Sequence, residues 1–220
     1  IGAYEANAAE LAVGFAADVR EGFAGTTFKL SNASTGITGT PTFAWKVTGG
    51  GQEFVSDEEN PSFKLDAVGW YRVELTVICD SGTGTYPEDD YLHVAPHDVY
   101  VAKDATGAVY PYDKLETATP DFATAWREVI ADATLHVSGL VTMAETLNID
   151  KKVLIVGVDG GDTDGLRRTD NKVVTLNHPA ATLRGLKITG GTQGVYIGSE
   201  GGIVEDCCVS NNVNRGSYVS

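Results

Sequence analysis

An internal repeat in the last third of the chain constrains the fold most strongly. Residues 173–176 align with 194–197 after a shift of 21 positions, and the same shift brings 181–191 onto 202–212. Five aligned pairs are apolar in both copies: Val174 with Val195, Leu176 with Ile197, Leu183 with Val204, Leu186 with Cys207, and Ile188 with Val209. A unit of 21 to 22 residues with two short strands predicts coils stacked about 4.8 Å apart, with inward apolar side chains in ladders.

The stacking also predicts which outward side chains meet. Arg184 lies one repeat before Glu205, so the two side chains are expected to form a solvent-exposed ion pair worth at most about 1 kcal/mol. By the same count, Lys187 takes Cys208 as its ladder neighbour. Both pairings follow directly from the 21-residue shift.

The residues before the repeat predict one helix followed by strands. Thr119 is expected to be the N-cap and Pro120 the first helical residue, with Asp121 favoured by the helix dipole. The amphipathic spacing runs to about Asp132 and includes Phe122, Ala125, Trp126, Val129 and Ile130. Strands are expected at 134–137, 145–149 and 152–156.

These segments together carry a family resemblance. The matching stretches are 98–101, 122–131, 147–157, 173–176 and 183–191. They resemble the N-terminal part of right-handed parallel β-helix proteins of the pectate-lyase-like superfamily. The resemblance implies that the helix caps the open end of the coil stack, where it covers strand edges that otherwise invite aggregation. It implies little about chemistry, because the superfamily includes lyases, hydrolases, adhesins and non-enzymes.

The first 95 residues contain short alternating strands separated by turn residues. Alternation with period two marks three stretches, 27–30, 42–47 and 70–77. In the last of them, Val73, Leu75 and Val77 share one face of the expected strand. Several short strands in so few residues predict an antiparallel sandwich.

Part of this half resembles PKD-type immunoglobulin-like domains. The stretches that carry the resemblance are 43–51, 60–63 and 67–77. It implies that Trp45 fills the space between two sheets, where a large aromatic ring buries about 150–250 Å². The chain departs from the family's acidic Trp-Asp-Phe-Gly-Asp-Gly run, with Lys46 and Gly50 in that region. The resemblance therefore concerns the fold and not a carboxylate site.

The chain is thus predicted to be all-β with two domains. Residues 1–96 form an immunoglobulin-like β-sandwich, and residues 97–220 form the helix-capped N-terminal portion of a right-handed parallel β-helix. The chain starts at Ile1 without a signal-like segment, so we expect a processed or trimmed product. The last residues resemble the start of a strand, and we expect the natural polypeptide to continue beyond Ser220.

The charge balance argues against some partners. Thirty acidic and sixteen basic residues give a net charge of −14. Such a chain repels polyphosphate, so nucleic acid and anionic membrane surfaces are poor partners. No apolar run approaches the roughly 20 residues that span a bilayer. The oligomeric state is left open by the sequence.

One acidic loop is the best candidate for a metal site. Asp159, Asp162 and Asp164 fall within six residues, and carboxylate oxygens are suitable ligands for Ca²⁺. Asp-Gly pairs are also ordinary turn chemistry, so a solvated turn is the competing interpretation. We expect no other cofactor, because the three Cys and four His show no metal-ligand spacing.

Candidate ligand contacts lie on the outside of the coils. Tyr196 and Tyr218 are expected to point outward one coil apart, either to stack on a sugar or simply as surface residues. Arg184 and Glu205 are further outward candidates. Polysaccharide cleavage needs paired carboxylates or a Ca²⁺ cluster with a basic residue, and the sequence shows neither arrangement.

The favoured role is a secreted or cell-surface bacterial protein that binds carbohydrate, such as a polysaccharide or cell-surface glycan, or another surface partner, without catalysis in this segment. Two alternatives stay open. One is the non-catalytic front of a β-helix polysaccharide lyase or glycoside hydrolase, and the other is a structural spacer in an adhesin. An outward groove of aromatics and carboxylates would favour the enzyme, and a featureless exterior would favour the spacer.

Overall fold

The structure is a computed structural model that describes residues 10–160 and 162–219. Strands dominate these residues, accompanied by one 3-10 helix, η1 (Leu115–Thr117), and one α-helix, α1 (Phe122–Glu128). The all-β prediction is confirmed. The chain divides into two compact units, Ile1–Ala95 and Pro96–Ser220, which we call unit 1 and unit 2. Neither of the two described helices has the length and apolar character needed to cross a membrane.

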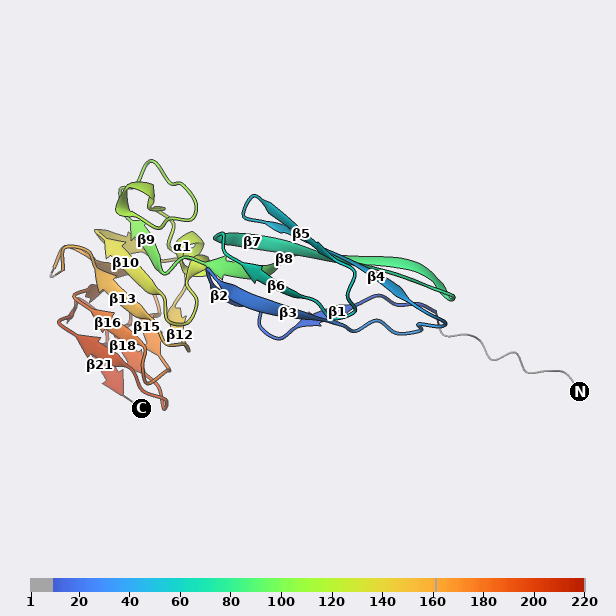
Figure 1. Cartoon of the computed structure of the whole chain (residues 1–220). Helices are drawn as coiled ribbons and strands as arrows, with labels where there is room; N and C mark the ends of the chain where they lie inside the picture. Colours follow the sequence, from blue (N-terminus) through green and yellow to red (C-terminus); the bar gives the residue numbers. More distant parts are fainter. Residues whose placement is uncertain (1–9, 161, 220) are drawn as a thin grey trace, which may run out of the picture. The chain divides into compact units, whose positions relative to one another are not determined.

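Unit 1 consists of two sheets (Figure 1). One has the strand order β1-β3-β6 and the other has the order β2-β8-β7-β4-β5. Neighbouring strands are antiparallel, except that β2 runs parallel to β8. The bounds are β1 (Phe15–Ala17), β2 (Glu21–Phe23), β3 (Thr26–Asn32), β4 (Thr42–Gly49), β5 (Gln52–Ser56), β6 (Ser62–Leu65), β7 (Gly69–Cys79) and β8 (Gly82–Ala95).

Both sheets of unit 1 contribute to one apolar core. The alternation in β7 buries Val73 and Leu75 completely, while Glu74 between them stays half-exposed. Trp45 of β4 is buried in the same cluster as Phe28 of β3, so its ring lies between the two sheets as expected. The indole Nε1 donates a hydrogen bond to the carbonyl of Glu58 at 2.9 Å, which satisfies its only polar atom.

The chain of unit 2 winds into stacked coils, whose strands form three parallel sheets (Figure 1). The first sheet has the order β9-β10-β13-β16-β19, the second β11-β14-β17-β20 and the third β12-β15-β18-β21. Figure 1 labels most strands of the first sheet and all strands of the third. The bounds are β9 (Asp98–Ala102), β10 (Thr134–Ser138), β11 (Leu140–Thr142), β12 (Leu147–Ile149), β13 (Leu154–Gly157), β14 (Gly165–Arg167), β15 (Lys172–Leu176), β16 (Thr182–Arg184), β17 (Lys187–Thr189), β18 (Gln193–Ile197), β19 (Ile203–Glu205), β20 (Cys208–Ser210) and β21 (Arg215–Val219).

From β10 onward, each coil gives one strand to each sheet, so the described residues form four coils of three strands. The expectation of two strands per unit is therefore wrong. In three of these coils, all except the one that contains β13 and β14, the first and second strands are separated by a tight corner at a left-handed residue. These residues are Gly139 (φ 70°), Gly185 (φ 60°) and Asp206 (φ 51°). Because so few residues form the corner, the two strands merge into one apolar pattern in the sequence.

The 21-residue register itself is confirmed. The predicted neighbours pair in parallel strands: Val174 with Val195, Leu176 with Ile197, Leu183 with Val204, Lys187 with Cys208, and Ile188 with Val209. The inward ladder of the first sheet extends this pattern through Leu135, Ile155 and Leu183, all fully buried. Stacked apolar side chains thus form the core of unit 2.

Helix α1 begins later and ends earlier than predicted. Its N-cap is Asp121, whose carboxylate accepts hydrogen bonds from the backbone N–H groups of Ala123 at 2.7 Å and Thr124 at 3.2 Å. Thr119 instead accepts a hydrogen bond from the Asp121 N–H, so its assignment as the N-cap was wrong. A carboxylate is the stronger acceptor at the positive end of the helix dipole. The helix contacts β9, the outermost strand of the first sheet.

Candidate binding surface on the third parallel sheet

The outer face of the third sheet carries a column of polar side chains. Leu147 and Ile149 of β12 point inward and are buried, so Asn148 between them points outward and is exposed. The parallel register places Thr175 of β15 beside Asn148, and Tyr196 of β18 beside Thr175. We call the surface around Asn148, Thr175 and Tyr196 the outer groove.

Three hollows meet at Asn148 in the outer groove. The helix hollow, about 600 Å³, lies between α1 and residues 142–148. The loop hollow, about 580 Å³, lies at the start of β12 and β15, and the strand hollow, about 400 Å³, lies at their other end. The helix and loop hollows share Glu145, Thr146 and Asn148, and the loop and strand hollows share Asn148 and Thr175.

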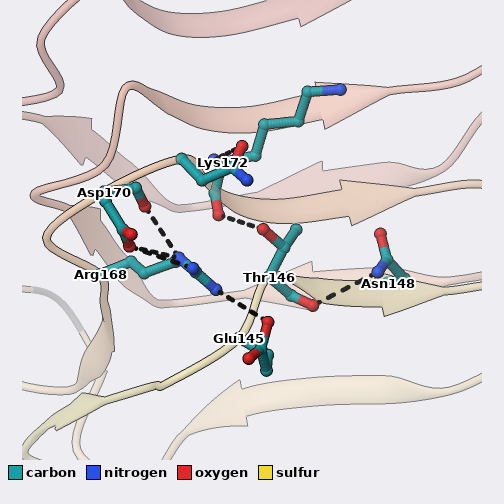
Figure 2. A network of polar contacts seen from close by, with 7 residues as sticks. Glu145, Thr146, Asn148, Arg168, Asp170 and Lys172 are labelled. Atoms are coloured by element: carbon teal, nitrogen blue, oxygen red, sulfur yellow. Dashed lines mark hydrogen bonds and ion pairs between the residues drawn. The ribbon is translucent and has the colours of Figure 1, made fainter.

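A polar network joins residues that line the loop hollow to the neighbouring residues Arg168 and Asp170 (Figure 2). The Thr146 hydroxyl donates a hydrogen bond to the carbonyl of Lys172 at 2.8 Å, which ties one coil to the next. Arg168 Nε donates to the carbonyl of Asp170 at 2.8 Å, and Nη2 lies 3.0 Å from the Asp170 carboxylate. Arg168 Nη1 reaches back to the Glu145 carboxylate at 3.9 Å. The guanidinium therefore connects two loops of adjacent coils.

Arg168 is the most deeply placed charge of this network. Its side chain is 7% exposed, whereas the carboxylate partners Glu145 and Asp170 are 94% and 77% exposed. Burial of a guanidinium requires opposite charge and hydrogen bonds nearby. Asp170 supplies both, and Glu145 adds a second opposite charge. Nη1 is buried without a hydrogen-bond acceptor in the part of the chain that the structure describes. With Lys172, the group contains two cations and two carboxylates, so its formal charges balance.

Tyr196 is positioned by a cation above its ring. The Lys172 ammonium lies 3.7 Å from the ring centroid, a typical cation–π geometry. The ring is half-buried, and it occupies the outward column that the sequence predicted. Tyr218 is the register neighbour of Tyr196 in β21, but its side chain lies outside those that the structure describes.

The other two predicted ligand contacts lie on a different sheet. Arg184 of β16 and Glu205 of β19 form the predicted ion pair, with Nε and Oε2 2.8 Å apart. Both side chains are about half exposed. They belong to the first sheet, whereas Tyr196 belongs to the third, so the four predicted residues do not form one site.

The acidic loop is organised by one of its three carboxylates. Asp164 is 1% exposed and accepts hydrogen bonds from the backbone N–H groups of Gly139, Asp159 and Gly160, at 2.6 to 3.1 Å. Asp159 and Asp162 have exposed side chains. Within residues 10–160 and 162–219, no group of three His, Cys, Asp or Glu side chains is arranged to hold a metal ion. Both oxygens of Asp164 thus serve the turn.

Several residues in or beside the outer groove were missed in the sequence. The first two coils differ most from the 21-residue length, so most of their residues have no aligned partners in the repeat. Asn148, Arg168 and Lys172 are among these residues. The ladder offset is 27 from Leu147 to Val174, for example, and 21 from Val174 to Val195. The available signal was the polar residue between two apolar ones at 147–149, which marks an outward position in a strand.

No known family model matches the chain, and a search of curated proteins finds no significant match. The function therefore has to be inferred from the site. The groove offers amide, hydroxyl and ammonium groups beside aromatic rings, which are groups that bind and orient a polar ligand.

Proposed function

We propose that this chain binds a neutral carbohydrate in the outer groove and is not catalytic in this segment. The observation that carries the proposal is the meeting of three hollows at Asn148, with aromatic rings at both ends. Trp126 lines the helix hollow and Tyr196 lines the strand hollow. Linked hollows suit an elongated ligand better than a compact one.

The polar groups of the groove complement sugar hydroxyls. Each hydroxyl is both a donor and an acceptor, and so needs partners of both kinds. The amides of Asn148 and Asn177 and the hydroxyl of Thr175 provide donors and acceptors along the loop and strand hollows. Aromatic side chains present flat apolar surfaces that match the C–H face of a sugar ring.

The charges favour a neutral ligand over a polyanionic one. Arg168 and Lys172 are offset by Glu145 and Asp170, and the ammonium of Lys172 is already engaged with Tyr196. The net charge of −14 repels acidic polymers at long range. A neutral glycan meets neither obstacle.

The fold supports a finer family assignment, which is also part of the proposal. Unit 1 is proposed to be a PKD-type immunoglobulin-like domain, because two sheets enclose Trp45 in a common core. Unit 2 is proposed to be the N-terminal part of a right-handed parallel β-helix of the pectate-lyase-like superfamily, supported by the three parallel sheets and by α1 against β9. Both modules suit an extracellular or cell-surface location.

Titration with neutral oligosaccharides tests the proposal. Cello-, xylo- and manno-oligosaccharides and acidic oligogalacturonides are titrated against the whole chain by calorimetry. We expect at least one neutral series to bind and the acidic series not to bind. Replacing Asn148 and Thr175 together by Ala is expected to weaken binding about tenfold or more, because two hydrogen bonds of about 1 kcal/mol each are lost.

A matched control uses threonines on another sheet. Thr134 and Thr182 also lie on strands, β10 and β16, but they belong to the first sheet and do not line the three hollows. The double variant Thr134→Ala with Thr182→Ala should bind as the unaltered chain does. Absence of binding to every neutral series would overturn the proposal and favour the spacer role.

A further inference from the structure

The helix hollow differs in chemistry from the two hollows beside it. Its walls include Phe122 and Trp126 of α1 and, on the facing segment, Met143 and Leu147. Phe122, Met143 and Leu147 are 8%, 5% and 3% exposed, so their side chains belong to the packed core and cannot turn away. The loop hollow, in contrast, is lined by Asn, Thr, Lys and Glu side chains.

The walls of the helix hollow are held in place by specific contacts. Lys151 Nζ donates to the carbonyl of Val129 at 2.5 Å and lies 5.0 Å from the centroid of the Trp126 ring. The Phe122 and Trp126 rings lie almost parallel, with centroids 6.3 Å apart. On the facing wall, the Met143 N–H donates to the carbonyl of Arg167 at 2.9 Å. The hollow is therefore formed before a ligand binds, which lowers the entropic cost of binding.

An unsubstituted sugar ring is a poor occupant of such a space. Hydroxyls that lie against the apolar part of the walls would lose their hydrogen bonds to water without finding partners, which is unfavourable for each group. Two polar residues line this hollow alone: Asp121, whose carboxylate already accepts two N–H groups of α1, and Thr142, which is exposed. An alkyl or acyl chain has no such groups and gains from each CH₂ that leaves water. The polar side chains shared with the loop hollow, Glu145, Thr146 and Asn148, lie at the boundary.

We propose that the helix hollow binds an apolar substituent, an acyl or alkyl group, of the glycan that occupies the outer groove. This inference rests on the proposed function and adds the ligand's chemical class: a neutral glycan that is apolar at one end. The sugar contacts Asn148 and Thr175, and the substituent extends past Thr146 between α1 and residues 142–147.

The test compares ligands that differ only in the substituent. The probes are the methyl and hexyl β-glycosides of cellotriose, xylotriose and mannotriose, titrated against the whole chain below their micelle concentrations. We expect the hexyl glycoside of the binding series to bind at least tenfold more tightly than its methyl counterpart. Equal affinities of the methyl and hexyl forms would overturn the inference while leaving the proposed function intact.

Trp substitutions that fill the helix hollow can be compared with a Trp substitution outside it. Ala123 and Ala144 line the helix hollow with exposed side chains, so Ala123→Trp and Ala144→Trp each add bulk there without disturbing the core. Each is expected to remove most of the hexyl advantage. Ala131→Trp, at an exposed position that does not line the hollow, should preserve that advantage.

The remaining outcomes separate the two proposals. If the hexyl advantage survives both filling variants, the chain binds the alkyl group elsewhere and the inference is wrong. If no glycoside binds and no neutral oligosaccharide binds, the proposed function fails first. If the hexyl forms bind but the Asn148→Ala and Thr175→Ala double variant has no effect, the sugar and the substituent do not occupy adjoining hollows, which also overturns the inference.

Discussion

The Lys172 ammonium lies over the ring of Tyr196, 3.7 Å from its centroid, although the two residues belong to successive coils. Lys172 begins β15, and the register partner of Tyr196 in that strand is Thr175. The cation therefore reaches diagonally along the sheet to cover one side of the ring. This contact limits where a sugar can stack on Tyr196 and adds a tie between coils.

A double-mutant cycle measures this tie. Lys172→Met retains the aliphatic stem and removes the charge, and Tyr196→Leu removes the ring. We expect a coupling of about 0.5–1 kcal/mol in the free energy of unfolding, as is usual for a cation–π pair near the surface. With Tyr196→Phe in place of Tyr196→Leu, most of the interaction should be preserved, because the aromatic ring remains. A coupling near zero in urea unfolding would show that the contact does not form in solution.

Arg168 is predicted to be the main polar anchor of its own loop, through Asp170, and to reach the preceding coil through Glu145. Arg168→Ala removes the hydrogen bonds to Asp170 and the ion pair to Glu145, and should lower the free energy of unfolding by about 2 kcal/mol. Arg168→Lys should restore less than half of the loss, because an ammonium lacks the fork that reaches both loops.

The adjacent Arg167 provides the control for this prediction. Its side chain is exposed, so Arg167→Ala should change the free energy of unfolding by less than about 0.5 kcal/mol. Equal effects of the Ala substitutions at 167 and 168 would contradict the role given to Arg168.

The repeat made the last two coils readable, and its absence concealed the first two. Val174, Val195 and the residues that follow them repeat at 21, so the register and the Arg184–Glu205 ion pair could be predicted. The earlier coils vary in length at their loops, and these loops carry Glu145, which lines two of the hollows, and Arg168, which lies beside it. Loops between the strands of a parallel β-helix tolerate insertions. The loops that shape a binding surface therefore also change the length of the coil, and the sequence repeat can no longer be recognised there.

The corners show a second limit of sequence reasoning. Gly139 and Gly185 occupy left-handed corners, and Asp206 occupies the same position one coil later. Glycine adopts this conformation without strain and Asp tolerates it, so two residue types mark one structural role. The sequence alignment paired Gly185 with Asp206 but did not mark either position as a corner, and two strands were therefore counted as one.

The pH dependence of one loop in unit 1 follows from Asp18. Its carboxylate accepts hydrogen bonds from the backbone N–H groups of Lys29 and Val19, at 2.9 and 2.8 Å. These bonds, the one from Lys29 above all, lower the pKa of Asp18 below its ordinary value of 3.8. A lowered folded-state pKa means that the stabilisation is complete above the unfolded value and is lost as the pH falls through the folded value.

The corresponding measurement follows Tm from pH 6 to pH 2 for the unaltered chain and for Asp18→Asn. We expect the unaltered chain to be the more stable near neutral pH, and the difference to shrink once the pH drops below about 4. Asp57→Asn, at another exposed carboxylate, serves as the comparison. A difference that is constant over the whole range would contradict the role of the Asp18 carboxylate.

Asp164 allows the two interpretations of the acidic loop to be separated. Its oxygens accept three backbone N–H groups that would otherwise lack partners, so Asp164→Ala should lower the free energy of unfolding by about 2–4 kcal/mol. Asp164→Asn should be nearly as harmful, because the amide NH₂ would face N–H donors. Asp159→Ala and Asp162→Ala remove exposed carboxylates, and each should change the free energy of unfolding by less than about 0.5 kcal/mol. Thermal unfolding with and without Ca²⁺ completes the test. A Ca²⁺-dependent rise in Tm that disappears in Asp159→Ala and Asp162→Ala would establish a metal site. A Tm that Ca²⁺ leaves unchanged in the unaltered chain and in both variants supports a turn built on Asp164 alone.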